Sequence, residues 1–304
     1  MQASTIVIAG GNGFLGHCLR EYFTALNYRI VILSRSPSRD PNIVTWDGRT
    51  LGAWVQELEG AAALINLAGR SVDCRYTDAN KRTILASRLE STRILGEAVA
   101  QCQRPPAVWL NSSTATIYQH TPGEQTVNTE AAGQIGSSFS EEVAKAWEEA
   151  FWAAPTPATR RVALRTAIVL GRQGGALPVL ARLARWGLCS PQGSGQQWIS
   201  WLHSEDFCRA VEFFLRAPEA TGVYNLCAPH PVRNRPFNQL LYQHFRPIVR
   251  LPQPAWLLEL GAFFLRTETE LILKSRKVYP QRLLAAGFTF RFPTCEATLA
   301  DLLS

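Results

Sequence analysis

The residues with the clearest chemical use are three glycines that follow a short apolar run near the start of the chain. Residues 5–16 read TIVIAGGNGFLG. Glycine allows φ > 0 and has no Cβ, so a diphosphate can reach the backbone and the free N–H groups at a helix start. This pattern predicts a dinucleotide site, and the alternative is a turn that serves only strand–helix packing. The expected cofactor contacts are Gly10, Asn12, Gly13, Phe14, Leu15 and Gly16.

The second apolar run, over 29–33, ends in residues that discriminate between nicotinamide cofactors. An Asp or Glu roughly 20 residues past the glycines usually holds the ribose 2′-OH of NAD(H). No acid stands there, and the chain offers Ser34, Arg35 and Arg39. Hydroxyl and guanidinium groups bind a 2′-phosphate, which a carboxylate would repel. NADP(H) is therefore favoured over NAD(H), and the alternative is that these arginines are solvated loop residues.

Alternating elements must position these residues. Strand-like runs at 62–66, 107–112 and 161–170 alternate with helical runs at 78–102 and 138–153. Such alternation predicts an α/β fold with a Rossmann-type, doubly wound parallel sheet. Because ligands bind at the carboxyl ends of parallel strands, we expect function at that edge. The corresponding segments are 10–16, 34–35, 66–69, 112–116 and 165–171.

The second half of the chain is less regular and predicts a smaller lobe. We expect helices over 203–216, 235–244, 255–265 and 296–303, and extended chain over 251–254 and 289–292. Residues 1–170 would form the NADP-binding domain, to which 197–216 return. Residues 171–196 and 217–304 would form a C-terminal substrate-binding lobe.

Composition narrows the classes of protein. With 304 residues, 46% hydrophobic and 18% charged, the chain is typical of an ordered protein. It shows neither a secretory leader nor a run of roughly 20 apolar residues, so no membrane role is predicted. None of the seven cysteines stands in a C-x-x-C pair, which predicts no metal site and reduced thiols in the cytoplasm. The net charge of +7 is not clustered, so no nucleic-acid partner is predicted.

Several motifs together resemble those of the extended short-chain dehydrogenases/reductases, which include nucleotide-sugar epimerases and dehydratases. They are GGNGFLG at 10–16, NLAG at 66–69, NSSTATIY at 111–118, RTAIVLG at 165–171 and QWISWLHSED at 197–206. The C-terminal LPQPAW at 251–256, KVYPQRLLAAGF at 277–288 and FRFP at 290–293 are similar to an "epimerase family protein" branch, whose C-terminal piece has no assigned role. The resemblance covers nearly the whole chain.

The resemblance implies further contacts with the cofactor and a small-molecule substrate, by default a nucleotide sugar. The riboses would pass along Asn66, Leu67, Ala68 and Gly69, although Asn66 could instead form a local Asx turn. Arg88 could reach the site, or it could lie on a solvated helix face. The family often pairs through the helices at 78–102 and 138–153, so the resemblance also implies a homodimer.

The family's acid–base residues are kept only in part. Ser113 and Thr114 lie four to five residues before Tyr118, where the family places a Ser or Thr that polarises a carbonyl; the register leaves both open. The Tyr-x-x-x-Lys pair itself is missing. The stretch SSFSEEVAKAWEEA at 137–150 offers Phe139 with Val143, or Ser140 with Ala144, in its place.

Three interpretations follow from the missing pair. The chain is an enzyme with a displaced acid or base, for which Tyr118, Glu130, His203 and Asp206 are candidates. Alternatively, it transfers hydride slowly with only hydroxyl polarisation and water, since loss of a general acid lowers a rate by roughly 10²–10⁴. The third interpretation is a catalytically silent NADP(H)-binding sensor or scaffold. On the substrate side we expect Trp198, Trp201 and His203, although both indoles could be core residues.

Overall fold

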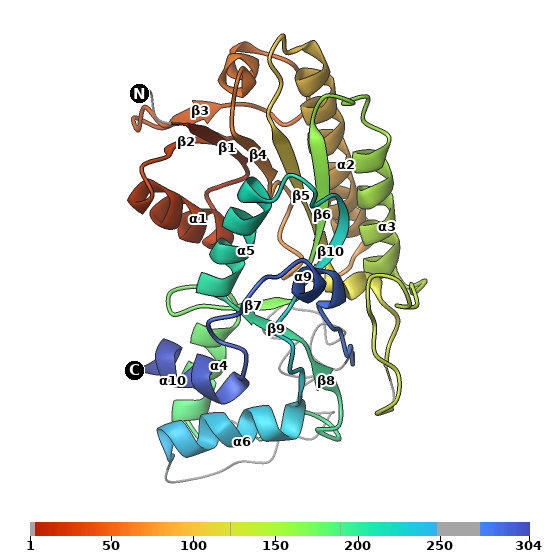
Figure 1. The fold of residues 1–304 in the computed structure, drawn as a ribbon. Helices are drawn as coiled ribbons and strands as arrows, with labels where there is room; N and C mark the ends of the chain where they lie inside the picture. The colour runs from red at the N-terminus through yellow and green to blue at the C-terminus, as the bar shows by residue number, and fades with distance from the viewer. Residues whose placement is uncertain (1–3, 122, 189, 248–273) are drawn as a thin grey trace.

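The chain folds around one large parallel sheet (Figure 1). The computed structural model describes residues 4–121, 123–188, 190–247 and 274–304. Seven parallel strands lie in the order β10-β6-β5-β4-β1-β2-β3, which confirms the predicted doubly wound α/β fold. The strands are β1 (Thr5–Ala9), β2 (Arg29–Ser34), β3 (Ile43–Thr45), β4 (Ala63–Asn66), β5 (Val108–Thr114), β6 (Arg160–Thr166) and β10 (Gly222–Leu226).

Helices cover both faces of the sheet, which explains the continuous apolar runs in its strands β1, β2 and β4. Helices α1 (Phe14–Ala25) and α5 (Ser204–Arg216) pack on one face, and α2 (Asp78–Gln101) and α3 (Phe139–Trp152) on the other (Figure 1). Within β1, Ile6 and Ile8 join the core under α1 and α5. Val7 and Ala9 join the core under α2, to which the 3-10 turn η1 (Ala53–Leu58) also contributes.

Local signals fix where the long helices begin. The Thr77 hydroxyl caps α2 by accepting the N–H of Asn80. Ser138 and Glu141 form a capping box at the start of α3, which satisfies two backbone donors reciprocally. Because α2 follows β4 and α3 follows β5 in a parallel sheet, the amino ends of both helices lie at its carboxyl edge, where the expected site residues gather.

Two expectations about the end of the sheet were wrong. The run 161–170 is not one strand, because the chain leaves the sheet after Thr166. It continues as β7 (Ile168–Leu170), which pairs with β9 (Trp201–His203) in a separate two-stranded sheet. Residues 222–226, expected in the second lobe, form the edge strand β10 beside β6. Both differences reflect backbone hydrogen bonds to segments distant in sequence.

The second lobe lies below the carboxyl edge of the sheet (Figure 1). Helices α4 (Leu177–Arg185), α6 (Asn234–Phe245) and α10 (Cys295–Leu303) share a small core that includes Trp201, Phe237 and Leu299. Strands β8 (Trp198–Ile199) and β11 (Val232–Arg233) pair beside it, and α9 (Gln281–Ala285) packs on β10.

Some expectations about this lobe have a different outcome. Residues 289–292 form no strand, and the segments expected at 251–254 and 255–265 lie outside the described residues. In the described ranges, no helix combines the length and the apolar content that a membrane span needs.

Candidate functional site

The turn after β1 is packed so closely that two of its glycines leave no room for a side chain. Gly10 has φ +75°, and a Cβ there would lie 2.7 Å from the Cα of Ala68. A Cβ on Gly16 would lie 2.1 Å from the carbonyl oxygen of Gly11. Gly13 has no neighbouring atom within 4 Å of its Cβ position. The turn therefore presses against the end of β4 and leaves open space at Gly13.

The amino end of α1 has the properties of an anion site. Gly13 is its N-cap, no side chain caps the helix, and no acid lies in its first turn. Its free N–H groups and dipole favour a phosphate at this end. The ring of Phe14 instead packs on the second lobe, because Cβ atoms on Gly171 and Gly174 would lie 2.4 and 2.3 Å from it. The residues of this turn therefore fit a dinucleotide diphosphate through their backbone.

At the end of β2, a polar group faces the α1 turn. Asn12 Nδ2 donates to Ser34 Oγ over 2.6 Å, and Ser34 Oγ also bonds the backbone of Ser36. Ser34 is buried, so its hydroxyl holds the turn in place. Arg35 is exposed beside it, and no described residue forms an ion pair with it. The Arg35 guanidinium and the Asn12 amide thus lie near the end of β2, where a carboxylate would hold the ribose 2′-OH of NAD(H).

The Asn66 side chain at the end of β4 is committed to the protein itself. Its Oδ1 accepts the Ala68 N–H over 3.0 Å, which is an Asx turn. Its Nδ2 donates to Asn111 Oδ1 over 2.7 Å and to Thr92 Oγ1 over 3.1 Å. The backbone that follows, at Leu67 and Ala68, lies beside the α1 turn.

At the end of β5, a buried carboxylate holds one of the two candidate hydroxyls. Ser113 Oγ donates to Glu148 Oε1 of α3 over 2.5 Å. The same carboxylate accepts Nε and Nη2 of Arg165 from β6, each over 2.8 Å. Burial opposes the charge on Arg165, but the ion pair keeps its pKa above the ordinary value. Because Ser113 donates to Glu148, its proton is not available to a carbonyl.

Thr114 is the hydroxyl that remains able to donate. It is half-buried, and its Oγ1 accepts the backbone N–H of Thr116 over 3.1 Å. Its proton can point either to Thr116 Oγ1, 2.6 Å away, or to a ligand. Of the two hydroxyls that the sequence left open, the geometry favours Thr114 for polarising a carbonyl.

Tyr118 lies inside the protein rather than at the edge of a cleft. It is 0% exposed, and its hydroxyl donates to Asn225 Oδ1 over 2.8 Å. That hydroxyl also accepts Nη1 of Arg165 over 3.0 Å. Burial raises the pKa of Tyr118 above its usual value, against the opposing effect of Arg165. This environment favours a structural role over proton transfer.

The other displaced acids of the sequence analysis are bonded to backbone groups. Glu130 accepts the N–H groups of Asn225 and Arg282 over 2.9 and 3.3 Å. Asp206, fully buried, accepts both N–H groups of 291–292 over 2.8 Å. Both carboxylates therefore tie distant segments together. Among the described residues, no cluster of three or more His, Cys, Asp or Glu side chains is placed to hold a metal ion.

Residues 6–227 match the model of the NAD dependent epimerase/dehydratase family. The chain belongs to this family. Residues 253–302 match a second model, a domain of unknown function (DUF1731). The human epimerase family protein SDR39U1 is 31% identical over 302 residues, which cover 98% of this chain and 99% of that protein. The epimerase family protein SSP1921 of Staphylococcus saprophyticus is 31% identical over 302 residues, with 98% of each chain covered.

Two solved structures share the fold. Human SDR39U1 (isoform 2), solved with NADPH, superposes with a TM-score of 0.88 at 29% identity, with 98% of each chain covered. The nucleoside-diphosphate sugar epimerase of Corynebacterium glutamicum gives a TM-score of 0.80 at 26% identity. That match covers 99% of this chain and 58% of the other. The extended short-chain dehydrogenase-like fold is therefore shared along nearly the whole chain.

In this epimerase/dehydratase chain, α3 carries no acid–base pair at the expected positions. Val143 and Ala144 are buried apolar residues, and Lys145 is exposed. Phe139 packs edge-on against Tyr76 with ring centroids 5.0 Å apart. In the described part of the structure, the hydroxyl of Ser140 is buried without a hydrogen-bond partner. None of these side chains replaces a phenol and an ammonium group.

The two tryptophans expected at the substrate differ in environment. Trp201 is fully buried in the core of the second lobe, and its Nε1 donates to the carbonyl of His230. Trp198 is half-buried. Arg233 Cζ lies 4.2 Å from the centroid of its ring, and Lys277 Nζ lies 4.5 Å from it. Because these two cationic side chains already lie over the ring of Trp198, a substrate could stack there only by displacing them.

His203 joins the two lobes. It is buried, and its Nδ1 caps α5 by accepting the Glu205 N–H over 2.9 Å. Its ring stacks on Phe292 with centroids 3.9 Å apart, and Nε2 lies 3.3 Å from Asp301 of α10. Burial lowers the pKa of His203, against the opposing effect of Asp301. The geometry thus favours docking of the C-terminal helix as its role.

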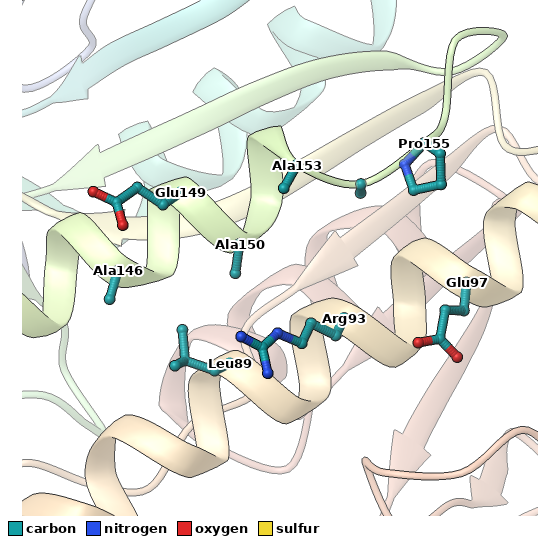
Figure 2. Close-up of a pocket in the computed structure, with 9 residues that line it drawn as sticks. Leu89, Arg93, Glu97, Ala146, Glu149, Ala150, Ala153 and Pro155 are labelled. Atoms are coloured by element: carbon teal, nitrogen blue, oxygen red, sulfur yellow. The ribbon is translucent and has the colours of Figure 1, made fainter.

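A groove between α2 and α3 lies away from these groups. Figure 2 shows Ala146 and Ala150 of α3, and Ala153 just after it, on the side of α3 that faces Leu89 and Arg93 of α2. The groove, about 440 Å³ in volume, is lined by Leu89, Arg93, Glu97, Ala146, Glu149, Ala150, Ala153, Ala154 and Pro155. These residues lie in the later turns of both helices and just beyond α3, toward the amino edge of the sheet. Pairing of two chains through these helices stays a prediction.

Sequence reasoning did not anticipate the network of Glu148, Arg165, Tyr118 and Asn225. The available signals were Arg165, which follows the apolar residues 162–164 of β6, and a second acid on the buried face of α3. They indicate a buried ion pair but do not identify its partners.

Proposed function

We propose that the chain binds NADP(H) at the turn between β1 and α1. The observation that carries this proposal is the uncapped, acid-free amino end of α1 beside the open Gly13. The NADPH in the solved structure of human SDR39U1 supports it. When bound there, the nicotinamide exchanges a hydride with a substrate carbon.

Preference for NADP(H) over NAD(H) is proposed from the end of β2. Arg35 is exposed and unpaired among the described residues, and Asn12 lies within hydrogen-bond distance of Ser34. A 2′-phosphate placed there would gain the guanidinium fork of Arg35. Arg35 rather than Ser34 is the residue proposed to select the phosphate, because the Ser34 hydroxyl is already bonded.

We propose that the chain is an oxidoreductase or epimerase-type enzyme for a small carbonyl or carbinol substrate. Thr114 would donate a hydrogen bond to the substrate oxygen and stabilise the charge that develops there. Glu148 would act through Ser113 and hold the end of β5 in register. With Tyr118 and Glu130 bonded inside the protein, water would exchange the proton, which predicts slow turnover.

The second candidate is a catalytically silent NADP(H)-binding sensor or scaffold. The observation that favours it is that Tyr118, Glu130, Asp206 and His203 all have structural partners. In that case NADPH binds tightly, and no carbonyl compound is reduced.

Calorimetric titration with NADP+, NADPH, NAD+ and NADH tests the cofactor. An Arg35→Asp variant should bind NADPH at least ~10–100-fold more weakly, since a charged hydrogen bond contributes about 1.5–3 kcal/mol. Arg104→Asp is the control, because Arg104 is exposed just before β5 at the amino edge of the sheet. Equal affinity of Arg35→Asp and the wild type for NADPH would overturn the assignment.

Turnover separates the two candidate functions. NADPH-saturated protein is mixed with a panel of aldehydes, ketones and nucleotide sugars, and NADPH absorbance is followed. For any compound reduced, Thr114→Val should lower kcat more than Ser113→Ala does. An inert NADPH complex across the panel favours the silent binder.

A further inference from the structure

Arg88 of α2 lies between the end of β4 and α3. Its Cζ lies 5.0 Å from the centroid of the Trp147 ring. A Cβ added to Gly69 would lie 3.1 Å from the same Cζ. The guanidinium is thus held against an indole and a glycine backbone rather than extended into solvent.

The hydrogen bonds of Arg88 leave much of its fork unused. Nη1 donates to the carbonyls of Ile84 and Arg70 over 3.0 and 3.1 Å. Nε and Nη2 have no partner in the ranges that the structure describes, and no carboxylate there forms an ion pair with Arg88. A guanidinium has five N–H donors, so donors remain for a ligand.

Partial burial without a counter-ion is unfavourable for this group. Burial lowers the pKa of Arg88 to about 10, with a smaller opposing effect from Tyr76. A desolvated charge destabilises the fold unless it is paired. An oxyanion on the free edge of the fork would supply that pairing, with two parallel hydrogen bonds.

The position of Arg88 connects it to both halves of the candidate site. Gly69 follows Ala68, which contacts the Gly10 turn. Trp147 precedes Glu148, which holds Ser113 next to Thr114. Arg88 therefore lies beside the segment that follows β4 at the carboxyl edge of the sheet, and it packs on the helix that also supplies Glu148.

We propose that Arg88, seated on Trp147 beside Gly69, forms an oxyanion site that takes a carboxylate or phosphate group. The anion is carried either by the substrate or by the cofactor. The assignment of the source rests on the proposed function, whereas the existence of the site does not. Arg104, by contrast, is exposed to solvent.

Arginine side-chain NMR tests the site directly. The Arg88 Nε–H resonance is assigned as the one that disappears in Arg88→Lys. Cofactor-free protein is titrated with inorganic phosphate and with malonate at constant ionic strength. We expect this resonance to shift and saturate. Arg104→Gln should retain the response, and Arg88→Gln should lack both the resonance and saturable phosphate binding.

A second arm distinguishes the sources of the anion. If the substrate supplies it, NADPH-saturated protein still binds phosphate or malonate, and Arg88→Gln binds NADPH as the wild type does. If the cofactor supplies it, NADPH shifts the Arg88 resonance, blocks both anions, and binds Arg88→Gln at least ~10-fold more weakly. No shift with phosphate, malonate or NADPH overturns the site. Failure of NADPH alone to bind overturns the cofactor proposal and leaves the phosphate titration decisive for Arg88.

Discussion

Replacing Arg165 by methionine should destabilise the fold strongly, because it leaves a buried carboxylate unpaired. The Arg165 and Glu148 side chains are only 11% and 9% exposed. Arg165→Met removes both ion-pair hydrogen bonds of Glu148 and the one to the Tyr118 hydroxyl. Among the described residues, the carboxylate then keeps its bond from Ser113 alone.

The expected loss is about 3–5 kcal/mol in the free energy of unfolding, the range for breaking a buried pair by removing one partner. The double variant Arg165→Met/Glu148→Met removes both charges and should recover part of this loss. The two single changes should therefore be strongly non-additive, since both residues belong to one network.

Urea titration followed by circular dichroism measures these free energies. The matched control is Arg216→Met, which breaks an i,i+4 ion pair with Glu212 on α5. Arg216 is 69% exposed, so its pair should contribute at most ~0.5 kcal/mol. A loss below ~1 kcal/mol for Arg165→Met, or strict additivity in the double variant, would refute the reasoning.

Three other predictions concern the glycine turn, the buried phenol and the C-terminal helix. Gly16→Ala places a Cβ 2.1 Å from a backbone oxygen and should abolish NADPH binding and lower the melting temperature. Gly13→Ala, with open space at its Cβ position, should fold normally, and equal melting temperatures of the two variants would contradict this. Tyr118→Phe should lose about 1–3 kcal/mol in urea titration because two buried partners lose their hydrogen bond; an unchanged midpoint would exclude that role. Burial lowers the pKa of His203 from 6.5, so its contribution to stability is complete above pH 6.5 and is lost as the pH falls toward the folded-state pKa. Between pH 6.5 and 5, His203→Gln should therefore lose less stability than the wild type, and parallel pH profiles of the two proteins would show that folding does not lower the pKa of His203.

Local sequence patterns predicted most of the first lobe. The alternation of apolar runs and helical segments gave the parallel sheet, and the helix over 203–216 corresponds to α5 (Ser204–Arg216). The break between β6 and β7 and the edge strand β10 could not be predicted, because each depends on which distant strand offers free backbone groups. A short apolar run predicts that a strand exists, but it does not predict which strand will pair with it.

Within the candidate site the same division holds. The glycines at 10 and 16 and the absence of an acid near Ser34 are readable in the sequence, because backbone sterics and charge act locally. The different roles of Ser113 and Thr114 could not be read from the sequence, because strand β5 places both residues at the same edge of the sheet. Their difference comes from Glu148, which reaches only Ser113.

The sequence by itself determined that a glycine turn opens a doubly wound sheet and that the Tyr-x-x-x-Lys pair is absent. The tertiary structure alone decided that Tyr118 is buried and that Arg88 lacks a counter-ion among the described residues. The physical reason is that the state of a buried polar group depends on partners brought from distant strands and helices. Asn225 on β10, which accepts the hydrogen bond of Tyr118, is one such partner.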